Sequence, residues 1–292
     1  MRAADLARLV ALAAIWGASF IFMRTVAPAL GPVVTAAART LLAAGALLAY
    51  FRWIGFDAEA ARHWRHFLVI GIVNSALPFS LFAFAAIHLP ASYLVILNAA
   101  TPLFAAVLSA LSEDERLTLP RAVGLVLGIA GVALVTRAGP VVPDAMFGWA
   151  IAAALAAALC YALAGIYIRR RVKGVKPMAI AGWSQLMAAV VLLPLVPFAP
   201  PPGSLTVVVA ANLLALGLLC SAVAYMLYFR LMVDVGPTRA MSVTFLLPVF
   251  GMLWSVLFLG ESVTPPMLAG CALIVGGIGL VARPAPHRAH PR

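Results

Sequence analysis

Residues 71–137 read GIVNSALPFSLFAFAAIHLPASYLVILNAATPLFAAVLSALSEDERLTLPRAVGLVLGIAGVALVTR, and residues 217–283 read GLLCSAVAYMLYFRLMVDVGPTRAMSVTFLLPVFGMLWSVLFLGESVTPPMLAGCALIVGGIGLVAR. The two segments align without a gap at an offset of 146, which is half of the 292 residues. The identical pairs include Gly71 and Gly217, Ser75 and Ser221, Pro102 and Pro248, Ser109 and Ser255, Glu115 and Glu261, Thr118 and Thr264, Gly124 and Gly270, and Gly131 and Gly277. The chain is therefore a duplicated unit.

The composition indicates that this unit lies in a membrane. Hydrophobic residues make up 65% of the chain and its mean hydropathy is +1.08, more than a soluble globule could bury in one core. Apolar runs of roughly 18 or more residues predict membrane spans, and these runs are too long and continuous for barrel strands. The first run is longer than a usual signal core, so we expect it to be retained. The ten predicted helices cover residues 6–27, 33–51, 67–87, 90–111, 119–137, 146–168, 178–198, 206–229, 236–259 and 265–282.

The positive charges report the topology of the chain. The formal net charge is +11, but with both termini in the cytoplasm 17 of the 20 Lys and Arg residues fall on the cytoplasmic side. Arg24 and Arg137 lie at outer ends and Arg39 lies within the second span. This asymmetry follows the positive-inside rule. It indicates the lipid bilayer as a partner and argues against nucleic acid.

Five spans in each half have a geometric consequence. An odd number of spans makes the second copy start on the opposite side of the membrane, so the predicted fold is an all-α membrane protein of ten transmembrane helices in two inverted five-helix repeats. We place the repeats at residues 1–142 and 143–292. Arg137 then ends the first copy outside and Arg283 ends the second inside. Inverted repeats are typical of secondary transporters, which hold a site near the midplane between the halves.

Short motifs add a family resemblance. The sequence has WGASF at 16–20, RTLLA at 39–43, Pro102, ERLT at 115–118 and the related GESVT at 260–264. This pattern resembles the EamA-type drug/metabolite transporter superfamily over nearly the whole chain. The resemblance implies a carrier of small molecules in the bacterial inner membrane that works by alternating access. Length and the ten-helix layout are most similar to the YddG-like exporters of aromatic and other amino acids.

Two helix faces are the first candidates for substrate contact. A small polar residue followed by two rings at i+4 and i+7 occurs on one face of the third helix and again, shifted by 146, on the eighth. The residues are Ser75, Phe79 and Phe82 on the third helix and Ser221, Tyr225 and Tyr228 on the eighth. Such faces could line an amphipathic pathway. An ordinary aromatic helix interface is the alternative, since duplication alone explains the recurrence.

Further polar, aromatic and proline residues are predicted to face the same cavity. Pro78, Pro102 and Pro248 lie within spans, where a proline frees a backbone carbonyl and can kink the helix for gating, although many such prolines are purely structural. The other candidate substrate-binding residues are Trp16, Ser19, Phe20, Arg39, Asn74, Pro78, Asn98, Thr101, Tyr161, Trp183, Gln185 and Thr244.

Arg39 is the one ionisable residue well inside a span. Its Cα lies about 9 Å below the outer boundary, from about six residues at about 1.5 Å each. The side chain could snorkel to the surface or be capped by carbonyls. All nine acidic residues fall at helix ends or in loops, so no carboxylate of the chain is expected to pair with it. A substrate carboxylate could, as in an amino acid or related organic anion.

Energy coupling leaves little trace in the sequence. Proton-driven carriers generally have an intramembrane Asp, Glu or His, whereas all five His residues here lie in loops or at helix ends. We therefore expect gradient-driven transport, with sodium coupling left open and no cofactor or metal. Glycines at 124, 128, 131, 270, 276, 277 and 279 predict close helix packing within each half, or contact between the subunits of a homodimer.

An enzyme is not expected. The sequence has no P-loop, zinc-ligand motif or nucleophile elbow, and its connections are too short for a soluble catalytic domain. A channel or lipid scramblase is the rival from another class, because the same helices could enclose a pore. Among carriers, a multidrug or nucleotide-sugar transporter is the alternative. Drug cations are poorly served by Arg39, and sugar nucleotides would require further buried cations.

Overall fold

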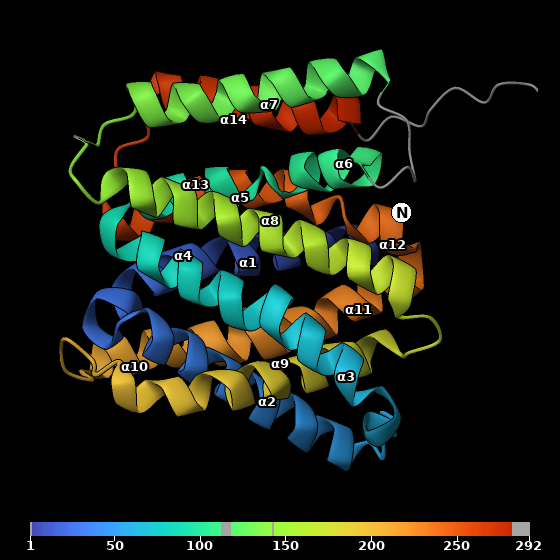
Figure 1. Ribbon diagram of the computed structural model, residues 1–292. Coiled ribbons are helices and arrows are strands. Elements are labelled where there is room, and N and C mark those ends of the chain that lie inside the picture. The colour runs from blue at the N-terminus through green and yellow to red at the C-terminus, as the bar shows by residue number, and fades with distance from the viewer. Residues whose placement is uncertain (1, 112–117, 142, 282–292) are drawn as a thin grey trace, which may run out of the picture.

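The computed structural model describes residues 2–111, 118–141 and 143–281, and every regular element in that part of the chain is a helix (Figure 1). Two elements, η1 and η3, are π-helical, and η2 is a 3-10 helix. In chain order the elements are α1 (Ala3–Leu30), α2 (Pro32–Trp53), α3 (Ala60–Gly71), η1 (Ile72–Ala76), α4 (Leu77–His88), α5 (Ala91–Asn98), α6 (Thr101–Leu111), α7 (Leu119–Ala138), α8 (Phe147–Arg171), α9 (Pro177–Leu192), η2 (Leu193–Phe198), α10 (Val207–Leu214), η3 (Ala215–Val223), α11 (Ala224–Val235), α12 (Pro237–Ala240), α13 (Val243–Leu259) and α14 (Pro265–Val281).

Ten spans are confirmed within the described residues. Eight helices, some made of consecutive helical elements, are long and apolar enough to cross a membrane, and α13 and α14 are shorter apolar helices of 17 residues each. The third span begins at Ala60, earlier than predicted, because its first turns carry basic and aromatic residues on an amphipathic helix. The fourth span is interrupted at Ala99 and Ala100, between α5 and α6.

Two of the three predicted proline kinks, those at Pro78 and Pro102, lie next to an interruption of the α-helix. Pro78 lies in the first turn of α4, directly after the π-helical η1. Pro102 follows the break between α5 and α6, as expected from the missing N–H of proline. Pro248 lies inside α13. Shifting η1 by 146 residues places it within η3, so both halves have a π-helical segment at the same point.

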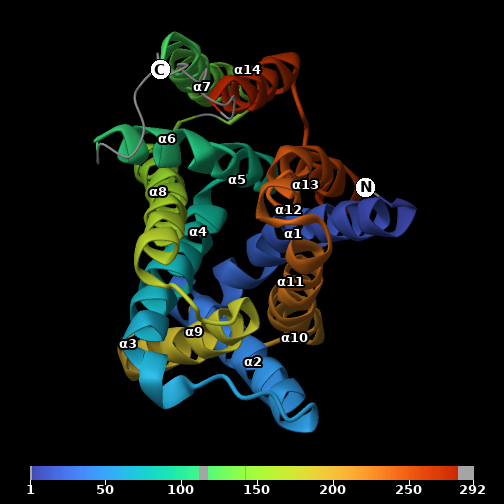
Figure 2. The same ribbon diagram turned by 90° about the vertical axis from the view of Figure 1, so that its right-hand side faces the viewer.

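The two halves interlock through equivalent helix pairs, as expected for inverted repeats. Helix α1 packs on α13, while its counterpart α8 packs on α5 and α6. Helices α2 and α9 are counterparts of each other and lie side by side (Figure 2). Helix α8 also packs on α4, and α1 on α11. Each side of the central region therefore combines segments from both halves.

Helices α7 and α14 form a pair at one edge of the molecule (Figure 1). Their backbones approach so closely that a Cβ added at Gly124 would lie 2.6 Å from the Gly277 carbonyl oxygen, and one at Gly131 would lie 2.5 Å from that of Gly270. The prediction of packing within each half is wrong for Gly124, Gly131, Gly270 and Gly277, which pack the last helix of one half against the last helix of the other. It is confirmed for Gly128, which meets Leu103 of its own half. Small residues allow the close approach of α7 and α14, whereas Gly276 and Gly279 of α14 have open space around them, so the homodimer alternative stays a prediction.

Candidate functional site

A reciprocal pair of hydrogen bonds joins the two halves at the centre of the molecule. Arg39 on α2 donates from Nε to Ser221 Oγ at 2.9 Å, and Gln185 on α9 donates from Nε2 to Ser75 Oγ at 3.0 Å. Both donors and both acceptors are related by the offset of 146. Each bond therefore runs from one half to the π-helical segment of the other, as expected of residues close to a pseudo-two-fold axis. All four side chains are buried.

The π-helical geometry helps to place the two serines. In η3 the Ser221 hydroxyl donates to the carbonyl oxygen of Leu216, five residues earlier, at 3.1 Å. It can at the same time accept the bond from Arg39, because a hydroxyl is both donor and acceptor. Single π-helical turns are frequent at functional sites, where they reposition side chains. Their presence in both halves beside Arg39 and Gln185 marks this region as the candidate site.

Arg39 points into the protein, so it does not snorkel to the membrane surface. Its residue exposure is 5%, and its guanidinium carbon lies 3.7 Å from the centre of the Phe79 ring, close enough for a cation–π contact. Within the described residues, no carboxylate forms an ion pair with it, and Nη1 and Nη2 have no hydrogen-bond partner. A buried cation with free donors is the main electrostatic feature of the site.

Aromatic rings extend the site on both sides. Trp16 of α1 lies 5.3 Å from Tyr228 and 6.3 Å from Tyr225 between ring centres, and Asn74 donates to the Tyr225 hydroxyl at 3.5 Å. On the other side, Phe82 lies 5.6 Å from Phe20 of the same half and 6.1 Å from Tyr161 of the second half. The structure thus brings together most of the predicted aromatic residues. Gln185 adds a buried Oε1 without a hydrogen-bond partner.

The remaining predicted site residues make local contacts. Ser19, Thr101 and Thr244 each donate to a backbone carbonyl three residues earlier in their own segment. Asn98 has a buried, unpaired Oδ1 at the end of α5. Trp183 stacks on Phe67 instead of facing Gln185. Pro78 is buried one residue before Phe79. Within the part of the chain that the structure describes, no hydrogen bond or ring contact joins these six side chains to Arg39.

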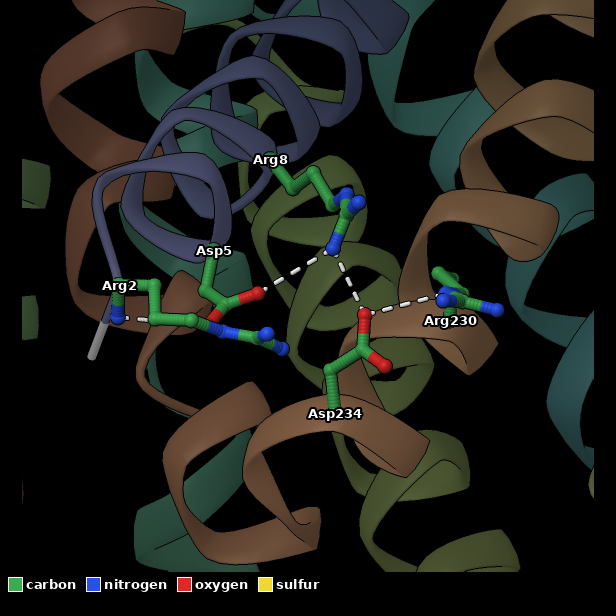
Figure 3. Close-up of polar contacts among 5 residues, drawn as sticks. All are labelled: Arg2, Asp5, Arg8, Arg230 and Asp234. Atoms are coloured by element: carbon green, nitrogen blue, oxygen red, sulfur yellow. Dashed lines mark hydrogen bonds and ion pairs between the residues drawn. The ribbon is translucent and has the colours of Figure 1, made fainter.

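Sequence reasoning missed two polar arrangements that connect the halves. Glu261 accepts hydrogen bonds from the backbone N–H groups of Ala91 and Ser92 at 2.7 and 3.0 Å and from the Ser92 hydroxyl at 2.8 Å, so it caps the start of α5. The repeated acidic motif could have suggested a shared role, although its first-half copy, Glu115, lies outside the described residues. The other is an ionic cluster that joins α1 to α11 (Figure 3).

Comparison with known proteins agrees with this architecture. The model of the EamA-like transporter family matches residues 6–137 and again residues 148–283, one match for each half. The chain belongs to the EamA-like transporter family. It is therefore a multi-pass membrane transporter and not an enzyme.

Several relatives of this EamA-like transporter extend over most of its length. It is 26% identical over 280 residues to a "Probable terminal-alkyne amino-acid exporter" of Streptantibioticus cattleyicolor, which covers 94% of this chain and 92% of the relative. It is 27% identical to the "Uncharacterized transporter YvbV" of Bacillus subtilis, covering 94% and 90%. A solved crystal structure superposes with a TM-score of 0.67 at 20% identity and covers 97% of each chain, which supports the fold.

The positions of Arg39 and Gln185 along their helices indicate how deep the site lies in the spans. Arg39 lies seven residues into α2, which is about 10 Å along the helix, and Gln185 lies eight residues into α9, about 12 Å from the opposite end. Both spans have 22 residues, so each of the two residues lies about a third of the way along its span, counted from opposite ends. A site at that depth between two repeats is where an alternating-access carrier binds its substrate.

Proposed function

We propose that this EamA-like transporter exports small amphipathic metabolites, above all amino acids including aromatic ones, by alternating access at the site around Arg39 and Gln185. This places it with the YddG-like branch of the superfamily, in the bacterial inner membrane with both termini cytoplasmic. The substrate is a small molecule, the surrounding partner is the bilayer, and the carrier is a monomer or homodimer.

The buried guanidinium of Arg39 carries the proposal. An unpaired charge in the membrane interior is energetically costly, so a charged residue kept there indicates a functional site. Ser221 and the Phe79 ring satisfy only part of this cation, and its two Nη groups remain available as donors. A planar guanidinium matches a carboxylate in a two-bond geometry that lysine cannot reproduce. The α-carboxylate of an amino acid therefore fits this position.

The surrounding residues suit the rest of an amino acid. Trp16, Tyr225 and Tyr228 form an aromatic wall in contact with the site, which can pack against an apolar or aromatic side chain. The unpaired Oε1 of Gln185 is an acceptor that an ammonium group could use. The Streptantibioticus relative is named as an amino-acid exporter, which supports the same substrate class.

The distribution of carboxylates supports a transport mechanism without proton coupling. Of the described acidic residues, Asp5, Asp57, Glu59, Asp144, Asp234 and Glu261 lie at helix ends or in loops. A proton relay would require such a group deeper in a span. We propose that the substrate gradient drives export. An imposed pH gradient that drives uphill uptake into liposomes would refute this part.

A ligand screen tests the substrate class. Purified protein is heated with aromatic and aliphatic amino acids, their amides and esters, amphipathic cations and a nucleotide sugar. We expect amino acids to raise the unfolding temperature and their amides, which lack the carboxylate, to have no effect. Arg39→Lys should lose most of this response, because an ammonium group offers no planar pair of donors. Stabilisation by cations alone would favour a multidrug carrier, and stabilisation by the nucleotide sugar alone would favour that class.

A further inference from the structure

Five charged side chains form a connected cluster where α1 begins and α11 ends (Figure 3). Arg8 Nη1 lies between two carboxylates, 2.7 Å from Asp234 Oδ2 and 3.2 Å from Asp5 Oδ1. Arg230 Nε lies 3.0 Å from the same Asp234 oxygen, and Arg2 Nε lies 3.4 Å from Asp5. Arg8 is thus the residue through which the two acids are held together.

The cluster links the two halves and is shielded from water. Asp5 and Arg8 belong to the first half and Asp234 to the second, 226 residues further along the chain. The side chains of Asp5 and Asp234 are only 3% and 10% exposed, while Arg8 is 34% exposed. Ion pairs that are partly removed from solvent are screened less by salt, and removing one partner leaves an uncompensated charge. Removing one partner therefore costs more than it does in an ordinary surface ion pair.

The same helix pair leads from this cluster to the candidate site. Below the charges, Leu9, Leu12 and Leu231 form a buried apolar layer. Below that layer Trp16 meets Tyr228 at 5.3 Å. Arg8 and Trp16 are eight residues apart on α1, which is about 12 Å. The contact between α1 and α11, here called the α1–α11 seam, is thus closed by an ionic layer, an apolar layer and the site aromatics.

Within the described residues, no ion pair joins the end of α4 to the start of α8, the equivalent places on the opposite face. The offset of 146 places the counterparts of Arg230 and Asp234 at Phe84 and His88, near the end of α4. Helix α8, the counterpart of α1, has no charged residue from Phe147 to Ile168. Inverted repeats build the two closures of a carrier from equivalent segments. Among the described residues, ion pairs join the helices at one of these closures. At the other, the charged groups bond to backbone instead: Arg24 donates to the carbonyls of Ala86 and Ile87, and Glu261 accepts from the N–H groups of Ala91 and Ser92.

We propose that the α1–α11 seam is the route by which substrate reaches the site from the face that carries the N-terminus, and that the Arg8–Asp234 pair closes this route. The inference rests on alternating access at the proposed site. Because the ion pairs between described residues of the two halves lie at this closure, they bias the carrier toward the state shut to that face, which is the cytoplasmic face by the charge distribution. Opening requires Arg8 to leave Asp234.

Single-cysteine labelling tests the proposal without any substrate. In a protein whose native Cys160, Cys220 and Cys271 are changed to Ala, Leu12→Cys places a thiol in the apolar layer, where Leu12 is fully buried. A membrane-impermeant maleimide is added from one face of the reconstituted protein at a time. Labelling from the N-terminal face reports how often the seam opens.

The variants of the Arg8–Asp234 pair should differ in how much they increase the labelling rate. Arg8→Gln leaves Asp5 and Asp234 facing each other, so we expect labelling from the N-terminal face to rise about 10-fold, equivalent to about 1.4 kcal/mol. Asp234→Asn leaves Arg8 paired with Asp5 and should have a smaller effect, roughly 3-fold, or about 0.65 kcal/mol. Glu59→Gln is the control, because it breaks the Arg62–Glu59 pair, whose side chains are 77% and 44% exposed. It should leave the labelling rate unchanged.

A salt series on the Leu12→Cys protein, with Arg8 and Asp234 unchanged, keeps the test independent of folding defects. Raising the salt from about 0.1 to about 1 M shortens the screening length from about 10 to about 3 Å. Labelling of Leu12→Cys should then increase, and Arg8→Gln should remove this salt response. The proposal would be overturned if the labelling rates of both Arg8→Gln and Asp234→Asn matched that of the Glu59→Gln control, or if they rose equally from both faces. The labelling uses no substrate, so its result stands even if the amino-acid screen shows no binding at the Arg39 site.

Discussion

Changing Arg39 to Gln removes the buried charge while the chain itself shows that Gln fits the position. Gln185 occupies the equivalent place in the other half and donates to Ser75 at 3.0 Å, as Arg39 donates to Ser221 at 2.9 Å. We therefore expect Arg39→Gln to fold normally and to keep the bond to Ser221. What it loses is the cation and the free Nη donors. The variant consequently isolates the electrostatic part of substrate recognition.

The expected loss of affinity follows from the type of bond removed. A hydrogen bond to a charged group contributes about 1.5–3 kcal/mol, which corresponds to a roughly 10- to 150-fold weaker dissociation constant. Calorimetry with the best amino-acid ligand from the screen measures this directly. The matching amide of that ligand, which has no carboxylate, should bind the variant and the unmodified protein equally weakly. An amino-acid affinity within about twofold of the unmodified protein would refute carboxylate recognition by Arg39.

Three further predictions concern packing, capping and the aromatic wall. Gly124→Ala should lower the thermal unfolding temperature, at a cost of about 1–3 kcal/mol, because its Cβ would meet the Gly277 carbonyl; Gly276→Ala, with open space around it, is the control that should not. Glu261→Gln should cost about 1–2 kcal/mol of unfolding free energy by weakening the cap on α5, and an unchanged chemical denaturation midpoint would contradict this role. Alanine at Tyr225 or Phe79 should reduce transport in vesicles at equal expression, and normal flux in both variants would remove the aromatic wall from the pathway.

The sequence predicts the helices and their pairing better than the contacts between them. Ten apolar runs and an offset of 146 are enough to predict the spans and the equivalence of Arg39 with Gln185 and of Ser75 with Ser221. The crossing of the hydrogen bonds, from each half to the serine of the other, depends on how the helices pack. No local pattern encodes that packing.

Two differences show the physical limits of reasoning from the sequence. Trp183 lies two residues before Gln185, a rotation of about 200° on an α-helix, so the two side chains point to opposite sides and Trp183 stacks on Phe67 instead. Asp5 and Asp234 look like ordinary charges at helix ends. Only the fold reveals that Arg8 holds them together between the halves.

The symmetry between the halves also suggests where specificity arises. At the site the repeats differ at two pairs of equivalent positions: Arg39 corresponds to Gln185, and Phe79 corresponds to Tyr225. A symmetric scaffold can alternate between two equivalent conformations, whereas an amino acid is itself asymmetric. A cation in one half and an amide with a free acceptor in the other provide distinct positions for its two charged groups.

Counterflow in proteoliposomes tests the central claim most directly. Liposomes are loaded with an excess of an unlabelled aromatic amino acid and diluted into a trace of the same labelled compound. A carrier that alternates access at the Arg39 site predicts transient, saturable accumulation of label above its external concentration, which Arg39→Gln abolishes. Label that only equilibrates, with a flux that rises linearly with concentration, would show a channel and contradict the account.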